Sequence, residues 1–287
     1  MRKGISVWAY DPKRPLPDVF RRAKEAGFEG VEVAIADDGP ITPTSTEADC
    51  RRIVEQAGEA GIALVALASG LGWKYPLISE TAAVRDQAAG KIRGSLEVAR
   101  YLGLDTILVV PGTVDPATPY DAAYRNAQSI LTALAPHAEA AGVAIGVENV
   151  WNKFLLSPVE MARFLDEIGS PFVGAYFDVG NVLLFGFPEQ WISILNSRIK
   201  RVHFKDFKRS VGTLAGFCAL TEGDVDWPAV TAALTRVGYT RGGSGDGWVT
   251  AEFFDCESDI AQISQGMDTI LSNVARSDAK KETIIDG

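Results

Sequence analysis

The sequence has few cysteines, and those few are poorly placed for cross-linking. Only three of the 287 residues are cysteine: Cys50, Cys218 and Cys256. They lie far apart, their number is odd, and no C-x-x-C motif occurs, which argues against a disulfide framework or a cysteine-based zinc knuckle. Free thiols of this kind fit a reducing cytoplasm, which is the location we predict.

Segments that would direct the chain to or through a membrane are also lacking. The chain begins Met-Arg-Lys-Gly-Ile-Ser-Val-Trp, a basic start without a sustained apolar stretch or a small-residue cleavage site. We therefore expect no secretory leader. Since no run of about 18 apolar residues occurs, we expect no membrane partner either.

Positive charge is the third shortage. Lysine and arginine number 28 against 37 aspartates and glutamates, which gives a formal net charge of −9. A surface of this sign repels phosphate backbones, so nucleic acid is not an expected partner. The remaining composition, 47% hydrophobic, is that of a globular protein with a substantial core.

Eight short apolar segments alternate with longer segments of helical periodicity. Most of the short segments are continuous apolar runs, which is typical of parallel strands buried on both faces. The predicted strands cover residues 4–8, 30–35, 63–69, 106–111, 144–150, 174–179, 199–204 and 248–253. The predicted helices cover residues 17–26, 45–60, 80–102, 120–141, 158–168, 188–196, 227–237 and 258–274.

This alternation predicts a (β/α)8 TIM barrel. Each unit has about 36 residues, and a strand with its crossover helix needs about 30. A glycine recurs where a helix passes into the next strand, a weak internal repeat formed by Gly27, Gly61, Gly103, Gly142 and Gly238.

An open doubly wound sheet is the alternative fold. It is disfavoured because no G-x-G-x-x-G motif follows the first predicted strand and no break in composition suggests a second domain. We predict a single barrel domain over residues 1–276 and a loose polar tail over residues 277–287.

Four consecutive predicted strands each carry one ionisable residue near their carboxyl end, inside an apolar run. These residues are Glu148, Asp178, His203 and Glu252. Catalytic groups of such barrels stand at the carboxyl ends of the strands, where all four would meet. A buried carboxylate costs several kcal/mol unless it is paired or bound to a metal. A divalent cation satisfies all four residues, with Mn²⁺, Mg²⁺ or Co²⁺ best suited to the ligands and Zn²⁺ as an alternative.

Each of the four has a purely structural alternative. Glu148 can bridge polar groups of the core, and Asp178 can cap a turn. His203 can be a hydrogen-bonded core histidine, and Glu252 can pair with Lys205. Because each ligand makes the others more credible, we favour the metal site.

Residues around these four are candidates for binding substrate. Trp8, Glu32 and Trp73 lie at or near the ends of early strands, where the tryptophans can contact a ligand or fill the top of the barrel. The substrate-binding candidates are Lys205, Asp206, Asn181, Trp8 and Asn149.

Two segments invite a phosphate-binding interpretation. Lys208 and Arg209 lie in the long loop 205–226 on the catalytic face, where they can hold a phosphate or remain a solvated basic pair. The glycine-rich run 241–247 precedes the last strand and so belongs to the opposite face, where we predict a flexible turn.

The chain resembles the xylose-isomerase-like sugar isomerase/epimerase superfamily over about residues 3–275. The nearest likeness is to the branch of pentulose-5-phosphate 3-epimerases and hexulose-6-phosphate isomerases. The phrases that carry it are GVEV at 30–33, GVEN at 146–149, FDVGN at 177–181, VHFKD at 202–206, EGDVDW at 222–227 and TAEF at 250–253.

The resemblance implies that Glu148, Asp178, His203 and Glu252 bind one divalent metal, most often Mn²⁺, and that Glu148 and Glu252 transfer protons. The implied activity is isomerisation or epimerisation of a ketose or ketose phosphate through a metal-stabilised enediolate. Return of the proton to the opposite face inverts the carbon, whereas return to the neighbouring carbon gives an aldose. Barrels of this kind often form dimers or tetramers.

Other functions remain open on the same scaffold. A lyase or dehydratase acting on an inosose or keto-sugar, including a C-deglycosidase-like enzyme, would use the same metal and base. Asn181 stands where some free-ketose epimerases have a histidine, which weakens a direct assignment to that group. A non-catalytic sugar-binding barrel conflicts with the intact ligand set. Cleavage of abasic DNA is disfavoured because the chain has only two histidines and is acidic.

Overall fold

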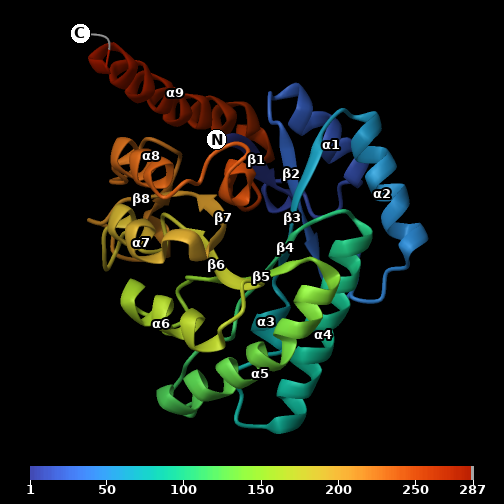
Figure 1. Cartoon of the computed structure of the whole chain (residues 1–287). Helices are drawn as coiled ribbons and strands as arrows, with labels where there is room; N and C mark the ends of the chain where they lie inside the picture. The colour runs from blue at the N-terminus through green and yellow to red at the C-terminus, as the bar shows by residue number, and fades with distance from the viewer. Residues whose placement is uncertain (286–287) are drawn as a thin grey trace.

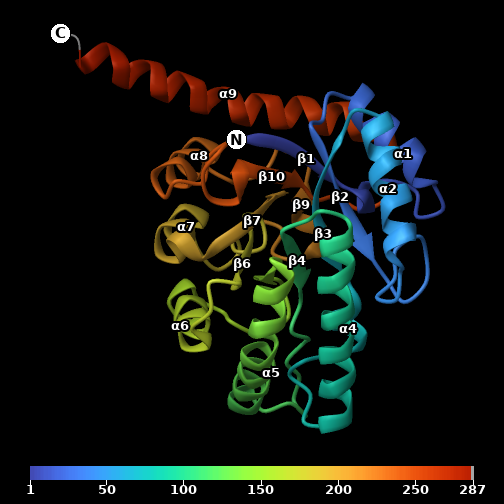
Figure 2. The ribbon, with the colours of Figure 1, turned by 45° about the vertical axis from the view of Figure 1, so that its right-hand side comes forward.

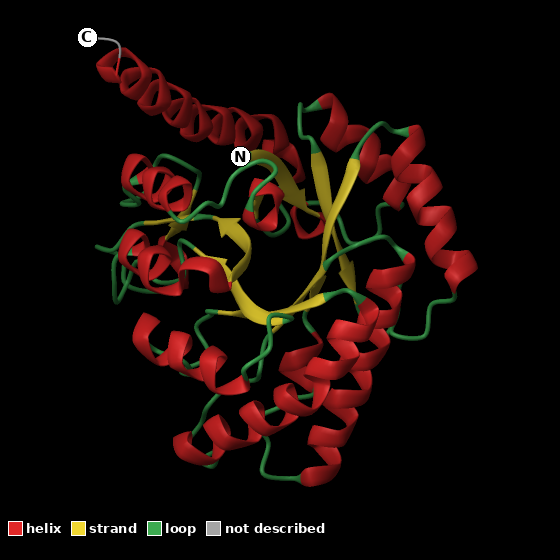
Figure 3. Ribbon diagram, viewed as in Figure 1, coloured by secondary structure: helices red, strands yellow, loops and turns green. Residues whose placement is uncertain are grey.

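Eight parallel strands close into a barrel in this computed structural model, which describes the backbone of residues 1–285 and the side chains of residues 1–272. The strands form an inner ring with the helices outside it (Figure 3). The strands of the ring, in chain order, are β1 (Arg2–Ser6), β2 (Gly30–Ile35), β3 (Ala63–Ser69), β4 (Thr106–Val109), β5 (Ala144–Glu148), β6 (Val173–Asp178), β7 (Ile199–Phe204) and β10 (Trp248–Ala251).

Helices follow the strands in sequence and surround the ring (Figure 1). This is the predicted (β/α)8 barrel, closed by pairing of β1 with both β2 and β10. The helices are α1 (Leu16–Glu25), α2 (Glu47–Glu59), α3 (Leu71–Lys74), α4 (Ala82–Tyr101), α5 (Tyr120–Ala141), α6 (Pro158–Ile168), α7 (Pro188–Leu195), α8 (Trp227–Arg236) and α9 (Ile260–Ile285).

Elements predicted from the sequence differ from the observed ones mainly at their ends. β1 begins and ends two residues earlier than predicted, and β5 and β10 each stop two residues short, at Glu148 and Ala251. As a result, Glu148 is the last residue of its strand and Glu252 is the first residue of the loop that follows β10.

Local sequence signals explain where the helices begin and end. Thr46 caps α2 in a capping box with Asp49, whose carboxylate accepts a hydrogen bond from the Thr46 backbone N–H. The five predicted glycines after helices α1, α2, α4, α5 and α8 all have positive φ, between 66° and 89°. They confirm the predicted repeat, since only glycine enters this region without strain.

Close packing inside the barrel requires a glycine in β2. A Cβ atom on Gly30 would lie 2.5 Å from Val65 Cγ2 and 2.7 Å from Trp248 Cη2. The indole of Trp248 therefore packs directly against Gly30, and a side chain at position 30 would occupy the same space. It belongs to a second buried cluster, with Val65 and Tyr176, separate from the main core between strands and helices.

Additional elements decorate the loops. The segment between β7 and α8 forms a two-stranded antiparallel hairpin of β8 (Asp206–Phe207) and β9 (Phe217–Cys218). The glycine-rich run 241–247 forms a turn ending in a 3-10 helix (Ser244–Gly247) directly before β10, at the end of the barrel opposite the strands' carboxyl termini, as predicted.

The carboxyl-terminal region differs from the prediction. Residues predicted as a loose tail over 277–287 continue α9 as far as Ile285, and residues 286–287 lie outside the described residues. Figure 2 shows α9 extending past the barrel on the side of α8. Its first turns are tied to β1, because the buried Lys3 Nζ donates to Ser264 Oγ at 2.9 Å. None of the described helices is long and apolar enough to cross a bilayer.

Candidate metal centre and substrate cavity

Strand register brings the four predicted ligands to one level of the barrel. Asp178 at the end of β6 pairs with His203 on β7. Glu148 is the last residue of β5, and Glu252 follows β10, where its backbone N–H donates to the Phe204 carbonyl at 3.1 Å. Parallel strands end at the same face, so the four side chains converge.

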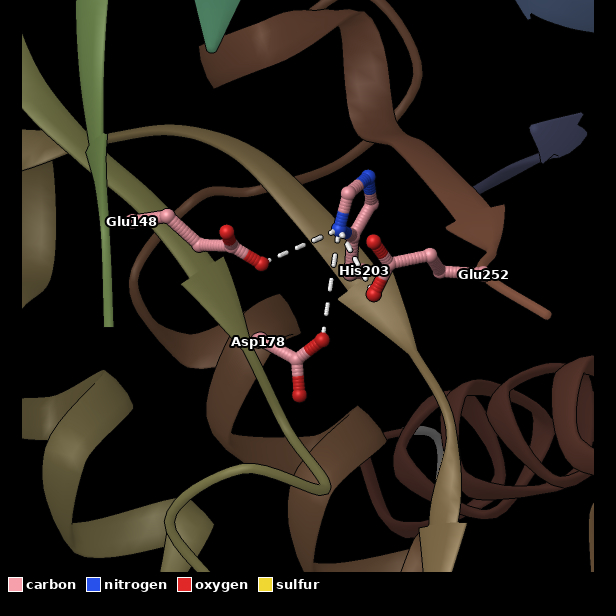
Figure 4. A group of neighbouring side chains, drawn as sticks. All are labelled: Glu148, Asp178, His203 and Glu252. Carbon is pink, nitrogen blue, oxygen red and sulfur yellow. Dashed lines mark ion pairs between the residues drawn. The ribbon is translucent and has the colours of Figure 1, made fainter. Parts of the chain in front are cut away.

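Three carboxylates surround one nitrogen of the histidine (Figure 4). Nδ1 of His203 lies 3.6 Å from Glu148 Oε1, 3.9 Å from Asp178 Oδ2 and 3.5 Å from Glu252 Oε2. One ligand atom from each of the four residues lies within 4.8 Å of the others, and no side chain of the four is more than 6% exposed. The sequence prediction that these residues meet is correct.

The chemistry of this cluster fits a divalent cation. Among the described residues, His203 Nδ1 is buried without a hydrogen-bond partner, and the buried Asp178 Oδ2 and Glu252 Oε2 have only an ion pair with the Lys205 ammonium. Buried polar atoms of this kind call for an ion or an ordered water. One imidazole nitrogen and several carboxylate oxygens that face a common point form a donor set shared by Mn²⁺, Mg²⁺, Co²⁺ and Zn²⁺.

Lys205 supplies positive charge at the edge of the cluster. Its Nζ lies 3.1 Å from Asp178 Oδ2 and forms a second ion pair with Glu252 Oε2. Burial works to lower the pKa of this ammonium, but the carboxylates of Asp178, Glu252 and Glu148 raise it well above its ordinary value. Lys205 is therefore the salt-bridge partner that the sequence offered as one of two interpretations.

The carboxyl groups meet different electrostatic surroundings. Burial raises the pKa of Asp178 to about 7, with the Lys205 ammonium opposing and the nearby carboxylates adding to the effect. Burial and the charge of Glu252 also raise the pKa of Glu148. For Glu252, burial is outweighed by Lys205 and His203, which hold its pKa well below the usual range. The two glutamates are thus chemically distinct in the metal-free protein.

A buried glutamate on β2 contacts the second ring nitrogen of His203, Nε2, and so orients the ring. Both carboxylate oxygens of Glu32 lie within hydrogen-bond distance of His203 Nε2, at 3.1 and 2.9 Å, and the Tyr176 hydroxyl donates to the same carboxylate. All three side chains are fully buried. This contact assigns the Nε2 proton to the side of Glu32 and leaves Nδ1 free to face the carboxylates.

Replacing Glu32 with glutamine is expected to weaken metal binding by about 10-fold to 100-fold, because the substitution removes the charge that orients His203. The measurement is titration of Mn²⁺ into chelator-treated protein by calorimetry. Glu29→Gln is the matched control, since Glu29 directly precedes the same strand and pairs with Arg2 and Arg241, away from the cluster. Equal affinity in the Glu32 and Glu29 variants would contradict this role.

Asn149 and Asn181 hold the end of β6, which carries Asp178. Asn149 Oδ1 accepts from the Asp178 N–H, and its Nδ2 donates to the Asp178 carbonyl, both at 2.8 Å. Asn181 donates its backbone N–H to Asp178 Oδ1 at 2.7 Å. Gly180 lies between Asp178 and Asn181 in the sequence. It is so close to Lys205 that an added Cβ would lie 2.5 Å from Lys205 Cγ. The FDVGN phrase therefore fixes the positions of Asp178 and of its ion-pair partner Lys205.

Asp206 has a different environment from the one predicted. Its buried carboxylate accepts hydrogen bonds from the backbone N–H groups of Phe207, Thr221 and Val225 and from the Trp227 indole, at 2.8 to 3.2 Å. With both oxygens engaged, Asp206 holds the β7–α8 loop together and does not line the cavity. Asn149 does not line it either, because its side chain is directed at Asp178.

A cavity of about 940 Å³ opens directly above the cluster. Of the four clustered residues, Glu148 and Glu252 line it, whereas the fully buried Asp178 and His203 do not. The predicted substrate residues Trp8, Lys205 and Asn181 line it as well. A ligand in this cavity therefore has direct access to both glutamates.

Two features of the cavity differ from what the sequence suggested. Lys208 and Arg209 are absent from its lining, and Arg209 instead interacts with Asp224 through its backbone N–H at 2.7 Å. The lining also contains Phe253 and Phe254, together with apolar residues of the β7–α8 loop, which sequence reasoning did not single out. Adjacent aromatic residues directly after Glu252 were the available signal.

Comparison with known proteins supports the same assignment of fold. The chain is 22% identical over 282 residues to L-ribulose-5-phosphate 3-epimerase UlaE of Salmonella paratyphi C, an alignment covering 96% of this chain and 97% of the relative. It is 25% identical over 192 residues to 2-epi-5-epi-valiolone 7-phosphate 2-epimerase of an Actinoplanes species, with 67% of each chain covered.

A solved structure matches over nearly the whole chain. The crystal structure of a D-tagatose 3-epimerase-like protein superposes with a TM-score of 0.79 at 20% identity, covering 96% of this chain and 99% of the other. The profile of the xylose isomerase-like TIM barrel family matches residues 20–273. On this match, and on the closed barrel, the chain belongs to the xylose isomerase-like TIM barrel family.

Proposed function

We propose that this protein is a divalent-metal-dependent epimerase or isomerase of a keto-sugar, with Glu148 and Glu252 as its acid and base. Its curated relatives, at 22 to 25% identity, carry the names of sugar-phosphate epimerases. The same names support epimerisation over the alternative of aldose formation.

One observation carries the proposal. Glu148 and Glu252 are the two of the four clustered residues that line the cavity, while Asp178 and His203 are fully buried and do not line it. The two glutamates come from β5 and from the end of β10, with β6 and β7 between them in the ring. A substrate seated over the cluster therefore meets a carboxylate from each of two sides.

The chemistry follows from this placement. A bound divalent ion supplies electrophilic polarisation of a carbonyl oxygen and so acidifies the neighbouring C–H bond. One glutamate then removes the proton, and the other delivers a proton to the opposite face, which inverts the carbon. Lys205 balances the charge of the carboxylates, and Asn181 and Trp8 are placed to contact the sugar.

The lyase alternative uses the same residues and differs in the fate of the intermediate. In a lyase, the intermediate would expel a substituent from the carbon next to the one that lost its proton. The two activities separate by their products. For this reason the test must report the position of isotope and the structure of the product together.

The test is deuterium incorporation followed by NMR. Metal-loaded protein is incubated in D₂O with ketoses, their phosphates and 3-keto sugars. Deuterium at C3 with an inverted product supports an epimerase, deuterium at C1 or C2 with an aldose supports an isomerase, and loss of a substituent moves the assignment to a lyase. Metal-loaded protein that exchanges no deuterium into any member of the panel would overturn the proposal.

A further inference from the structure

The cavity above the two glutamates has two chemically different parts. The inner part, next to the cluster, contains the polar side chains Glu148, Glu252, Lys205 and Asn181 together with the buried apolar side chains Leu108 and Val110. The outer part is walled by aromatic and aliphatic side chains from the loops after β1, β3, β7 and β10, namely Trp8, Trp73, Leu214, Phe217, Phe253 and Phe254.

Several of these outer side chains are unusually exposed for their size. Phe254 is 64% exposed, Trp73 50% and Leu214 70%. Phe254 also stacks on Trp8, with ring centroids 5.6 Å apart and planes inclined by 18°. A gathering of exposed apolar side chains around the entrance of a reactive site marks a surface that binds an apolar group.

Charge in the cavity is unsuited to a phosphate. Among the described residues that line it, none is arginine, and its two lysines already have carboxylate partners. Lys205 pairs with Asp178 and Glu252, and Lys74 donates to Asp37 at 2.5 Å. Phosphate sites in proteins rely on charge-assisted hydrogen bonds from available cationic groups, often bidentate arginine.

Carboxylates also outnumber ammonium groups in the lining. Glu148, Glu252 and Asp259 face the cavity against Lys74 and Lys205. A bound divalent ion would be engaged by the first two carboxylates and Asp178, leaving little net positive charge for a dianion. A monosaccharide seated on the inner part would leave the outer wall in contact with water.

Resting on the proposed function, we propose that the substrate is a keto-sugar without a phosphate group that carries an apolar, aromatic substituent. The sugar occupies the inner part of the cavity over the glutamates. The substituent lies against the outer wall beside Trp8 and Phe254. The class of substrate thus differs from the phosphorylated sugars for which the curated relatives are named.

The test compares three derivatives of one ketohexose that differ only at O6: 6-O-benzyl-D-fructose, 6-O-methyl-D-fructose and D-fructose 6-phosphate. Binding to the Mn²⁺-loaded protein is measured by calorimetry, and deuterium exchange is followed in parallel. We expect the benzyl compound to bind at least about ten-fold more tightly than the methyl compound, because it buries an aromatic ring. The phosphate is expected to bind no better than the methyl compound.

Phe254→Ala should reduce the advantage of benzyl over methyl, whereas Phe185→Ala should preserve it. Phe185 is the matched control because it is 80% exposed and does not line the cavity. Equal affinities, no binding of any of the three, or preferential binding of the phosphate would overturn the inference, as would a dimer that dissociates on Phe254→Ala without a benzyl preference. Deuterium exchange without a preference for the benzyl compound would refute the inference about the substituent but not the proposed function. A preference for the benzyl compound without deuterium exchange would refute the proposed function but not the predicted binding of the substituent.

Discussion

Replacing Glu148 with glutamine is expected to lower the rate of proton exchange at the substrate carbon by about 10²-fold to 10⁴-fold, the contribution of a positioned acid or base. Glutamine keeps the shape of the side chain and an oxygen ligand but cannot transfer the proton. Glu252→Gln should have an effect of similar size, because Glu252 lines the same cavity from the other side.

The fold is expected to survive both substitutions, with the larger loss of stability in Glu252→Gln, which removes one of the two ion pairs of the Lys205 ammonium. Burial and the charge of Glu252 already raise the pKa of Glu148, so a neutral side chain there removes repulsion in the metal-free protein. Rates should be measured at saturating Mn²⁺ with the metal content of each variant determined. Glu97→Gln, which alters an exposed pair with Arg100 on α4, is the matched control. Exchange at the normal rate in both cavity variants would refute the acid/base assignment.

Metal binding is expected to raise the thermal stability by a large amount. A ligand at one hundred times its Kd stabilises the folded state by about 2.7 kcal/mol, which corresponds to about 5 °C in Tm for a chain of this size. The physical cause is relief of repulsion among three buried carboxylates. Differential scanning calorimetry of chelator-treated protein, with and without Mn²⁺, measures the shift.

The two histidines of the chain provide an internal comparison for this experiment. His203 lies in the cluster, whereas His137 is exposed on α5. His203→Gln should abolish most of the Mn²⁺-dependent shift in Tm, and His137→Gln should retain it. A shift that persists in the His203 variant would place the metal elsewhere.

The barrel and its four clustered residues could be predicted because their signals are local. Continuous apolar runs mark buried parallel strands, and one ionisable residue inside such a run needs a compensating partner. Glu148, Asp178, His203 and Glu252 each satisfy this description within a few residues of sequence. Closure of the barrel then brings them together without any further information.

Glu32 meets the same description, yet its role could not be predicted. Its partner His203 is 171 residues away, and the contact crosses the interior of the barrel. Strand register determines such a contact, and a one-residue shift would turn the side chain to the other face. The sequence indicates only that Glu32 lies in an apolar strand.

Loop residues and the chain end were predicted least well. Asp206 follows the histidine directly, which suggested a contact with substrate, but the fold of the β7–α8 loop uses its carboxylate to hold backbone N–H groups. The exposed wall residues Leu214 and Phe254 have no periodic pattern to reveal them. Residues 277–285 are polar, yet alanine, lysine and glutamate there also favour helix, and α9 continues through them.

The most direct test of the account is deuterium exchange as a function of added metal. Chelator-treated protein is titrated with Mn²⁺ in D₂O, and incorporation of deuterium into the ketose that responds in the panel is followed by NMR. The account predicts that exchange rises linearly with Mn²⁺ and reaches a plateau at one ion per chain, with no such rise in the His203→Gln variant. Exchange at the full rate in protein shown to be free of metal would contradict it.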